Sequence, residues 1–202
     1  EYEPKFYFVY DFVWAKIMVA TFDQIGEAIA SAGSVRSLEV SGIDQDFDDL
    51  HIIFEGFTTG SGQPDPNTDV YIRVNGETSS SIYSQDVTIQ EGDGSYTADE
   101  IAPSTHSGWK LYNVPNVASG NIGQWAHFAA DINNYTTTTN KLCTVKLTTV
   151  RESWSYNGAL GMAGWAYHGT AAITSISVNC DTSHHIGGNS VLTVYGIKND
   201  NS

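Results

Sequence analysis

Residues 142–148 have the sequence LCTVKLT, and this stretch decides the class of fold. Cys143, Val145 and Leu147 alternate with polar residues, which is the period-two pattern of a β-strand with one buried face. Residues 173–180, ITSISVNC, repeat the pattern with Ile176 and Cys180 on one face. Both thiols are therefore predicted to be small buried core residues. A disulfide between them is an alternative that their spacing does not support.

Similar alternation recurs along most of the chain, separated by clusters of Gly, Pro, Asn and Asp that are typical of turns. The predicted strands are residues 34–41, 50–57, 70–74, 82–90, 109–114, 125–132, 142–150, 171–179 and 191–197. Nine strands are too many for one flat sheet with protected edges. The sequence therefore predicts an all-β protein, a jelly-roll-like antiparallel β-sandwich of two packed sheets.

The N-terminal region differs from the rest in its pattern. Phe22, Ile25 and Ile29 recur at helical spacing, with Thr21 as a cap and Gly33 as a stop, so residues 21–32 are predicted to form one short helix. The preceding aromatic residues are candidates for an assembly arm that packs on this domain or on a partner: Phe6, Phe8, Tyr10, Phe12 and Trp14. The expected organisation is residues 1–33 as arm and helix and residues 34–202 as the β-sandwich domain.

Composition restricts the partners. The 202 residues carry 9 Lys and Arg against 23 Asp and Glu, a formal net charge of -14, and the basic residues are scattered. This balance argues against nucleic acid as a partner. The chain also has no uncharged apolar run of the ~20 residues that a membrane span requires.

The acidic run at residues 44–49 resembles a calcium loop, because hard cations prefer carboxylate oxygens at alternate positions such as Asp44, Asp46 and Asp48. However, Asp49 occupies the sixth position, where the sharp turn of such a loop needs glycine. A solvated turn is therefore favoured and calcium is the weaker alternative. No cofactor is expected.

Two further patterns bear on metal binding and catalysis. Residues 180–189, CDTSHHIGGN, hold two adjacent histidines, which point in opposite directions in an extended chain, so a turn into the last strand is favoured over zinc. No catalytic motif is present, although a polysaccharide hydrolase needs only two carboxylates that meet in space. The spacing selects no pair among the carboxylates considered: Asp86, Glu91, Asp93, Asp99, Glu100 and Glu152.

Aromatic residues beside Asn- and Gly-rich loops suggest a lectin-like alternative, because exposed rings stack on sugar faces. The candidates for glycan binding are Trp109, Tyr112, Trp125, Trp154, Tyr156, Trp165 and Tyr167. The competing interpretation is that these rings fill the core and rim of the sandwich.

Several short stretches, in a fixed order along the chain, resemble the β-sandwich domain of tailed-bacteriophage minor structural proteins. They are DLHIIFEG with DVYIRVNGETSSSIYS, then ADINNYTTTTNKLCTVKL, and finally WAYHGTAAITSISVNCDTSHHIGGNSVLTVYGI. The matching positions are Asp49, Leu50, Asn75, Gly76, Glu77, Thr78, Tyr83, Ile132, Asn134, Tyr135, Lys141, Ile173, Thr174, Ile176, Ser190, Thr193, Tyr195, Gly196 and Ile197. Val194 stands where that family more usually has leucine. The resemblance covers about residues 19–198, so residues 1–17 depart from it.

This resemblance implies a non-enzymatic component of a virion, such as a head-decoration, fibre or tail-accessory protein. Its expected partners are other virion structural proteins and further copies of the chain, attached through the aromatic arm or a sheet face. Contact with a host-surface glycan is an additional expectation. The family has no catalytic residues to carry over.

Overall fold

The computed structural model describes residues 21–31, 35–60, 70–91, 96–101, 106–111, 114–115, 125–150, 159–180 and 184–199. These residues form fourteen β-strands and a single 3-10 turn, Ser80–Ile82. Every strand pairing is antiparallel. The predicted all-β antiparallel sandwich is confirmed.

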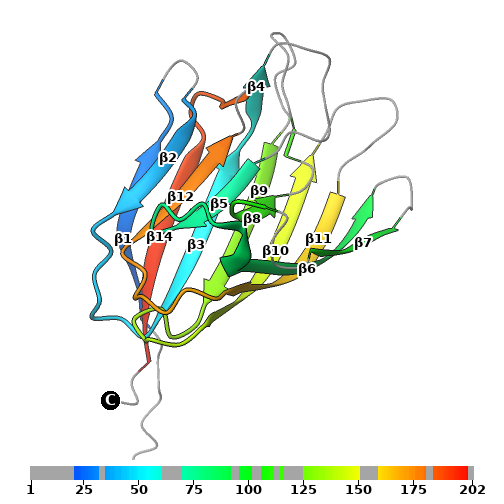
Figure 1. Cartoon of the computed structure of the whole chain (residues 1–202). Helices are drawn as coiled ribbons and strands as arrows, with labels where there is room; N and C mark the ends of the chain where they lie inside the picture. Colours follow the sequence, from blue (N-terminus) through cyan, green and yellow to red (C-terminus); the bar gives the residue numbers. More distant parts are fainter. Residues whose placement is uncertain are drawn as a thin grey trace, which may run out of the picture.

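Two sheets make up the sandwich, and Figure 1 shows the smaller one lying across the face of the larger. The large sheet has the order β1 (Thr21–Ile29), β14 (Val191–Lys198), β3 (Asp49–Gly56), β9 (Trp125–Ile132), β10 (Lys141–Val150), β11 (Ala159–Tyr167), β6 (Tyr83–Glu91) and β7 (Tyr96–Ile101). The small sheet has the order β2 (Ser37–Ser41), β12 (Ser175–Cys180), β5 (Val70–Val74) and β8 (Trp109–Leu111). A third, two-stranded sheet pairs β13 (His184–Ile186) with β4 (Thr58–Gly60).

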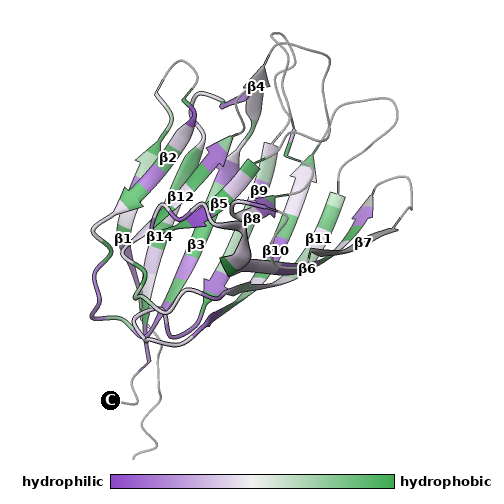
Figure 2. Ribbon diagram, viewed as in Figure 1, coloured by the Kyte–Doolittle hydropathy of each residue, from purple (hydrophilic) through white to green (hydrophobic). Residues whose placement is uncertain are grey.

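The core lies between the two main sheets and follows from the alternation of side chains along each strand. In β10 every second residue from Lys141 to Thr149 is buried and the residues between them are exposed. Figure 2 shows this alternation as bands of apolar and polar colour along the strands. At the centre, the ring of Trp165 is stacked between those of Phe128 and Trp109, with centroid distances of 5.2 and 5.1 Å. The inner faces therefore form one continuous hydrophobic core.

The predicted helix at residues 21–32 is wrong. Residues Thr21 to Ile29 form strand β1, which pairs with β14 from Thr21↔Lys198 to Ile29↔Val191. A register shift between Gln24 and Gly26 moves the outward positions from even to odd numbers, so Phe22 and Ile29 both reach the outer face. This bulge hides the period-two pattern and produces an apparent helical spacing. Pairing with a strand distant in the sequence outweighs the local pattern.

All nine predicted strands have a counterpart, and β5 and β9 have the predicted bounds. The sequence did not predict β4, β7, β11 and β13. Strand β11 is central, between β10 and β6, although its sequence, ALGMAGWAY, contains two glycines and lies where loop-borne aromatics were expected. Pairing on both sides supports this strand despite the low β-propensity of glycine and alanine.

Candidate functional site

The rings predicted to bind glycans occupy different environments. Trp109, Trp165 and Tyr167 are 1%, 3% and 4% exposed and belong to the core cluster. The structure therefore assigns these three rings to the core and not to an exposed stacking surface. Trp125 is 39% exposed. The other three candidates lie outside the described residues: Tyr112, Trp154 and Tyr156.

The outer face of the large sheet exposes a group of apolar side chains, which we call the outer apolar patch: Trp125, Val150, Leu160 and Met162. Val150 lies directly opposite Trp125 in the register of β9 and β10. Leu160 and Met162 follow each other on the same face of β11, opposite Thr148 and Lys146 of β10. The three aliphatic members are 55–60% exposed. The register therefore places two exposed apolar pairs on one face of the sheet, with Lys146 and Thr148 beside the second pair. Exposed apolar groups rimmed by polar residues are candidates for an interaction surface.

Trp125 is held in place from one side. Its ring meets that of Phe57 edge-to-face at a centroid distance of 5.3 Å. Phe57 in turn lies over Gly187, where a Cβ would come within 2.1 Å of the Phe57 ring. Next along the same outer face, Nδ1 of His127 lies 3.2 Å from Oε1 of Glu55. The exposed indole therefore has hydrogen-bonding side chains close by.

A second aromatic cluster lies at another corner of the outer face, at β1, β14 and β3. The His51 ring contacts Phe22 edge-to-face at 5.8 Å and Tyr195 at 6.2 Å. Nδ1 of His51 lies 2.6 Å from Oδ1 of Asp131 on β9. This cluster adds polar and aromatic groups to the same face.

Several residues that carry the phage resemblance make hydrogen bonds between turns at one end of the sandwich, the lower end in Figure 1. Nζ of Lys141, which is fully buried, donates to the backbone oxygens of Thr137 and Ala171 at 2.7 Å and of Gly169 at 3.4 Å. The Tyr135 hydroxyl donates to the backbone oxygen of Asp44. The side chains of Lys141 and Tyr135 therefore join turns that are distant from each other in the sequence.

Asn75 joins the same end through both its backbone and its side chain. Its φ of 54° lies in the left-handed region, which asparagine tolerates better than most residues. Its Oδ1 accepts from the backbone nitrogens of Thr174 at 2.7 Å and Ser175 at 3.2 Å, and its Nδ2 donates to the Ala172 oxygen at 2.8 Å. The turn after β5 is thereby bound to the segment before β12.

The acidic run forms a hydrogen-bonded turn. The backbone nitrogen of Asp46 donates to Oδ1 of Asp44 at 3.1 Å, and Oδ2 of Asp48 accepts from the backbone nitrogen of Asn199 at 2.6 Å. Within the described ranges, no three His, Cys, Asp or Glu side chains are grouped so that they could hold a metal ion.

Of the carboxylates considered for hydrolysis, the register places Asp86 on β6 opposite Glu100 on β7. Asp93 and Glu152 lie outside the described residues. For Glu91, Asp99 and Glu100 the structure describes the backbone alone. The pairing of Asp86 with Glu100 is therefore a statement about strand register and not about the distance between their carboxylates.

The two cysteines lie in different sheets and are not joined in a disulfide. Cys143 on β10 is buried as predicted, whereas Cys180 on β12 is only partly buried, because it is the last residue of its strand. Burial raises the pKa of Cys143 well above its usual value, which makes this thiol a poor nucleophile. Near Cys180, residues 184–186 form the short strand β13, and a turn with Asn189 at φ 65° leads into β14, as predicted. His184 and His185 are both partly exposed.

Comparison with known proteins gives no family. No family model matches the chain, and no curated protein matches it. Among solved structures, the metal-free carbohydrate recognition domain of Emp46p aligns over 83% of this chain and 87% of its own, with 9% identity and a TM-score of 0.23. The structure of infectious bursal disease virus Gx strain aligns over 90% of this chain and 37% of its own, with 16% identity and a TM-score of 0.13. Similarities this weak carry no argument about function. In the described part of the chain, no helix is long and apolar enough to cross a membrane.

Proposed function

We propose that the chain is a non-enzymatic structural protein of a bacteriophage virion, such as a capsid-decoration, fibre or tail-accessory protein. The outer apolar patch is the observation that carries the assembly role. Burying a leucine, valine or methionine side chain is worth roughly 1.5–3 kcal/mol relative to leaving it exposed. Val150, Leu160 and Met162 together therefore offer several kcal/mol to a partner that covers them.

The surroundings of the patch have the composition of an interface. Lys146 and Thr148 lie on β10 beside Met162 and Leu160 and are exposed. An apolar centre with a polar rim is the usual arrangement at protein interfaces. We expect the partner to be another virion protein or a further copy of the chain.

The phage resemblance supports the virion assignment. Its matching residues include Lys141, Asn75 and Tyr135, whose hydrogen bonds hold the turns at one end of the sandwich. Each of these bonds joins segments that lie far apart in the sequence, so the matching positions have structural roles in this chain, as the proposed assignment requires.

The test combines location with a matched pair of variants. Antibody against the full chain is expected to label virus particles by immunogold microscopy. The double variant Leu160→Ser, Met162→Ser is expected to be lost from particles. Leu142→Ser is the control, because Leu142 is 64% exposed on the same face but outside the patch. Label found only in particle-free fractions contradicts the virion role, and normal incorporation of the double variant contradicts the contact.

Trp125 favours a second candidate function, recognition of a glycan on a host surface. Its exposed indole, with the His127 and Glu55 pair close by, combines a stacking surface with hydrogen-bonding groups. Calorimetric titration with oligosaccharides selected on a glycan array tests this. Trp125→Ala is expected to abolish binding while Phe22→Ala, which removes an exposed ring at another corner of the face, keeps it. Absence of any saturable sugar binding counts against this function.

A further inference from the structure

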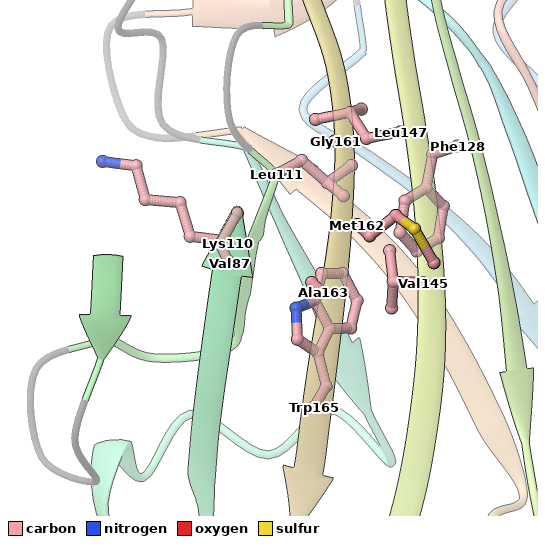
Figure 3. A pocket seen from close by; sticks show the side chains of 10 residues that line it. All are labelled: Val87, Lys110, Leu111, Phe128, Val145, Leu147, Gly161, Met162, Ala163 and Trp165. Atoms are coloured by element: carbon pink, nitrogen blue, oxygen red, sulfur yellow. The ribbon is translucent and has the colours of Figure 1, made fainter. Parts of the chain in front are cut away.

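An apolar space lies between β8 and the inner face of the large sheet, lined in part by Val87, Leu111, Val145 and Trp165 (Figure 3). Its free volume is about that of one water molecule, so it is a packing gap of the core and not a ligand site. A binding role is better supported at the edge of the large sheet, which neither function proposed above uses.

Strand β1 forms this edge. Among the described residues it pairs with β14 alone, and Figure 1 shows it on the side of the sheet opposite β7. An edge strand presents a row of backbone N–H and C=O groups on its open side, to which another strand can be added. Phe22 and Ile29 are each 57% exposed on the outer face of β1. The edge therefore combines open backbone groups with apolar side chains.

Two features of β1 disfavour its pairing with a second copy of itself. An antiparallel pair centred on Ile25 would place Asp23 opposite Glu27 of the other copy, and like charges directly opposite each other are destabilising. The bulge between Gln24 and Gly26 also interrupts regular pairing. An added strand must therefore be one that is apolar and not acidic at its ends.

The N-terminal residues of the chain have this chemistry. Residues 1–20 lie outside the described residues, and so do the candidates for the assembly arm: Phe6, Phe8, Tyr10, Phe12 and Trp14. Residues 6–14, FYFVYDFVW, match β1 in length and consist of aromatic and β-branched residues apart from Asp11. Such residues are enriched in strands. Lys5 and Lys16, which flank them, are opposite in charge to the acidic residues of β1.

The segment between these residues and β1 indicates which copy receives them. It is the six residues AKIMVA, 15–20, and no Gly, Pro, Asn or Asp occurs between Asp11 and Asp23. A tight hairpin onto the same β1 therefore lacks the residues that tight turns need. Six extended residues span about 20 Å, whereas paired strands lie about 4.8 Å apart, so the segment is long enough to reach a neighbouring copy.

We propose that residues 6–14 of one copy add as a strand to the open edge of β1 in a second copy. The added backbone bonds to the open side of β1, and the aromatic side chains cover Phe22 and Ile29. This inference rests on the assembly role proposed above, but it uses the edge of the large sheet and not the outer apolar patch.

Hydrogen exchange of the purified full chain, measured by mass spectrometry at high and low protein concentration, tests the proposal. Where sedimentation velocity shows association, the β1 amides that do not bond to β14 are expected to exchange about tenfold or more slowly than after dilution to the monomer. Slow exchange that is independent of concentration would assign the added strand to the same copy. That result overturns the proposal, as does fast exchange of these amides in the associated chain or a chain that does not associate.

Two pairs of variants show whether the N-terminal residues make the contact. Val9→Pro with Val13→Pro removes two backbone donors without altering the described sandwich, and is expected to abolish association. Val9→Thr with Val13→Thr is the matched control, since threonine favours strands and keeps both N–H groups. Association that survives the proline pair overturns the proposal.

The double variant Leu160→Ser, Met162→Ser separates this contact from the outer apolar patch. It is expected to associate as the unaltered chain does. Association that is lost in this variant but kept in the proline pair would assign the contact to the patch, which overturns strand addition and leaves the assembly role standing. Failure of the virion role itself appears in the immunogold experiment and not in these measurements in solution.

Discussion

The Nζ atom of Lys141 lies 2.7 Å from the backbone oxygen of Ala171, inside the protein and at the first residue of β10. The same ammonium group donates to Thr137 and Gly169. Burial lowers the pKa of Lys141, because removal from water disfavours the charged form. The hydrogen bonds to three carbonyl oxygens offset this cost. Through them the ammonium group connects the turn after β9 to the segment between β11 and β12.

Lys141→Met is expected to destabilise the fold by about 3 kcal/mol or more, since it leaves three backbone oxygens without their charged donor. Urea unfolding measures the change. Lys146→Met is the control, because Lys146 is exposed on the outer face of the same strand and its loss is expected to cost less than about 0.5 kcal/mol. Equal stability of the two variants would contradict the bridging role.

Replacements of Asn75 separate backbone conformation from side-chain bonding. Asn75→Gly keeps access to the φ of 54° but loses the bonds to Thr174, Ser175 and Ala172, at an expected cost of about 2 kcal/mol. Asn75→Ala is expected to cost about 1 kcal/mol more, because alanine disfavours the left-handed region. Unfolding in urea gives both values, and a glycine variant as stable as the unaltered chain would show that the side-chain bonds contribute nothing.

Buried tyrosines are expected to make the fold sensitive to alkaline pH. Burial raises the pKa of Tyr83 above its usual value of 10.0, and the pKa of Tyr167 is raised by the same cause. Above pH 10 the unfolded chain loses these protons while the folded chain keeps them. Stability that is fully present below pH 10 is therefore lost as the pH rises further.

The measurement is the urea midpoint at pH 8 and at pH 11 for the unaltered chain and for Tyr83→Phe. The variant is expected to be less stable at pH 8, because the Tyr83 hydroxyl accepts from Val74 N at 3.1 Å and donates to Glu77 O at 3.0 Å. Its loss of stability between the two pH values is expected to be smaller. An unchanged pH dependence would assign the alkaline effect to other groups.

Gly196 shows why one position of the phage-like pattern has no side chain. A Cβ there would lie 2.3 Å from the ring of Phe47, which packs against β14. Gly196→Ala is expected to cost about 1–3 kcal/mol through displacement of that ring. Gly164→Ala on β11 is the control, since nothing lies within 4 Å of its Cβ position. Thermal unfolding compares them, and an unshifted midpoint for Gly196→Ala would disprove the close packing.

The sequence predicted most of the fold because alternation is a local property of each strand. Residues 70–74 and 125–132 show it without interruption, and β5 and β9 have those bounds. The outer apolar patch was missed for a related reason. In residues 159–163, ALGMA, the larger side chains Leu160 and Met162 alternate with glycine and alanine, and this alternation was the available signal. It was not recognised because large apolar residues are ordinarily assumed to point inward.

By itself, the sequence determined that the chain is an antiparallel β-sandwich, where most strands lie and which turns separate them. Only the tertiary structure decided that residues 21–29 pair with β14, that Lys141 is buried, and that Trp165 faces the core while Trp125 faces solvent. The physical reason is that exposure and pairing depend on which strand becomes the neighbour. Side chains of the same type are buried or exposed according to contacts made by residues far away in the chain.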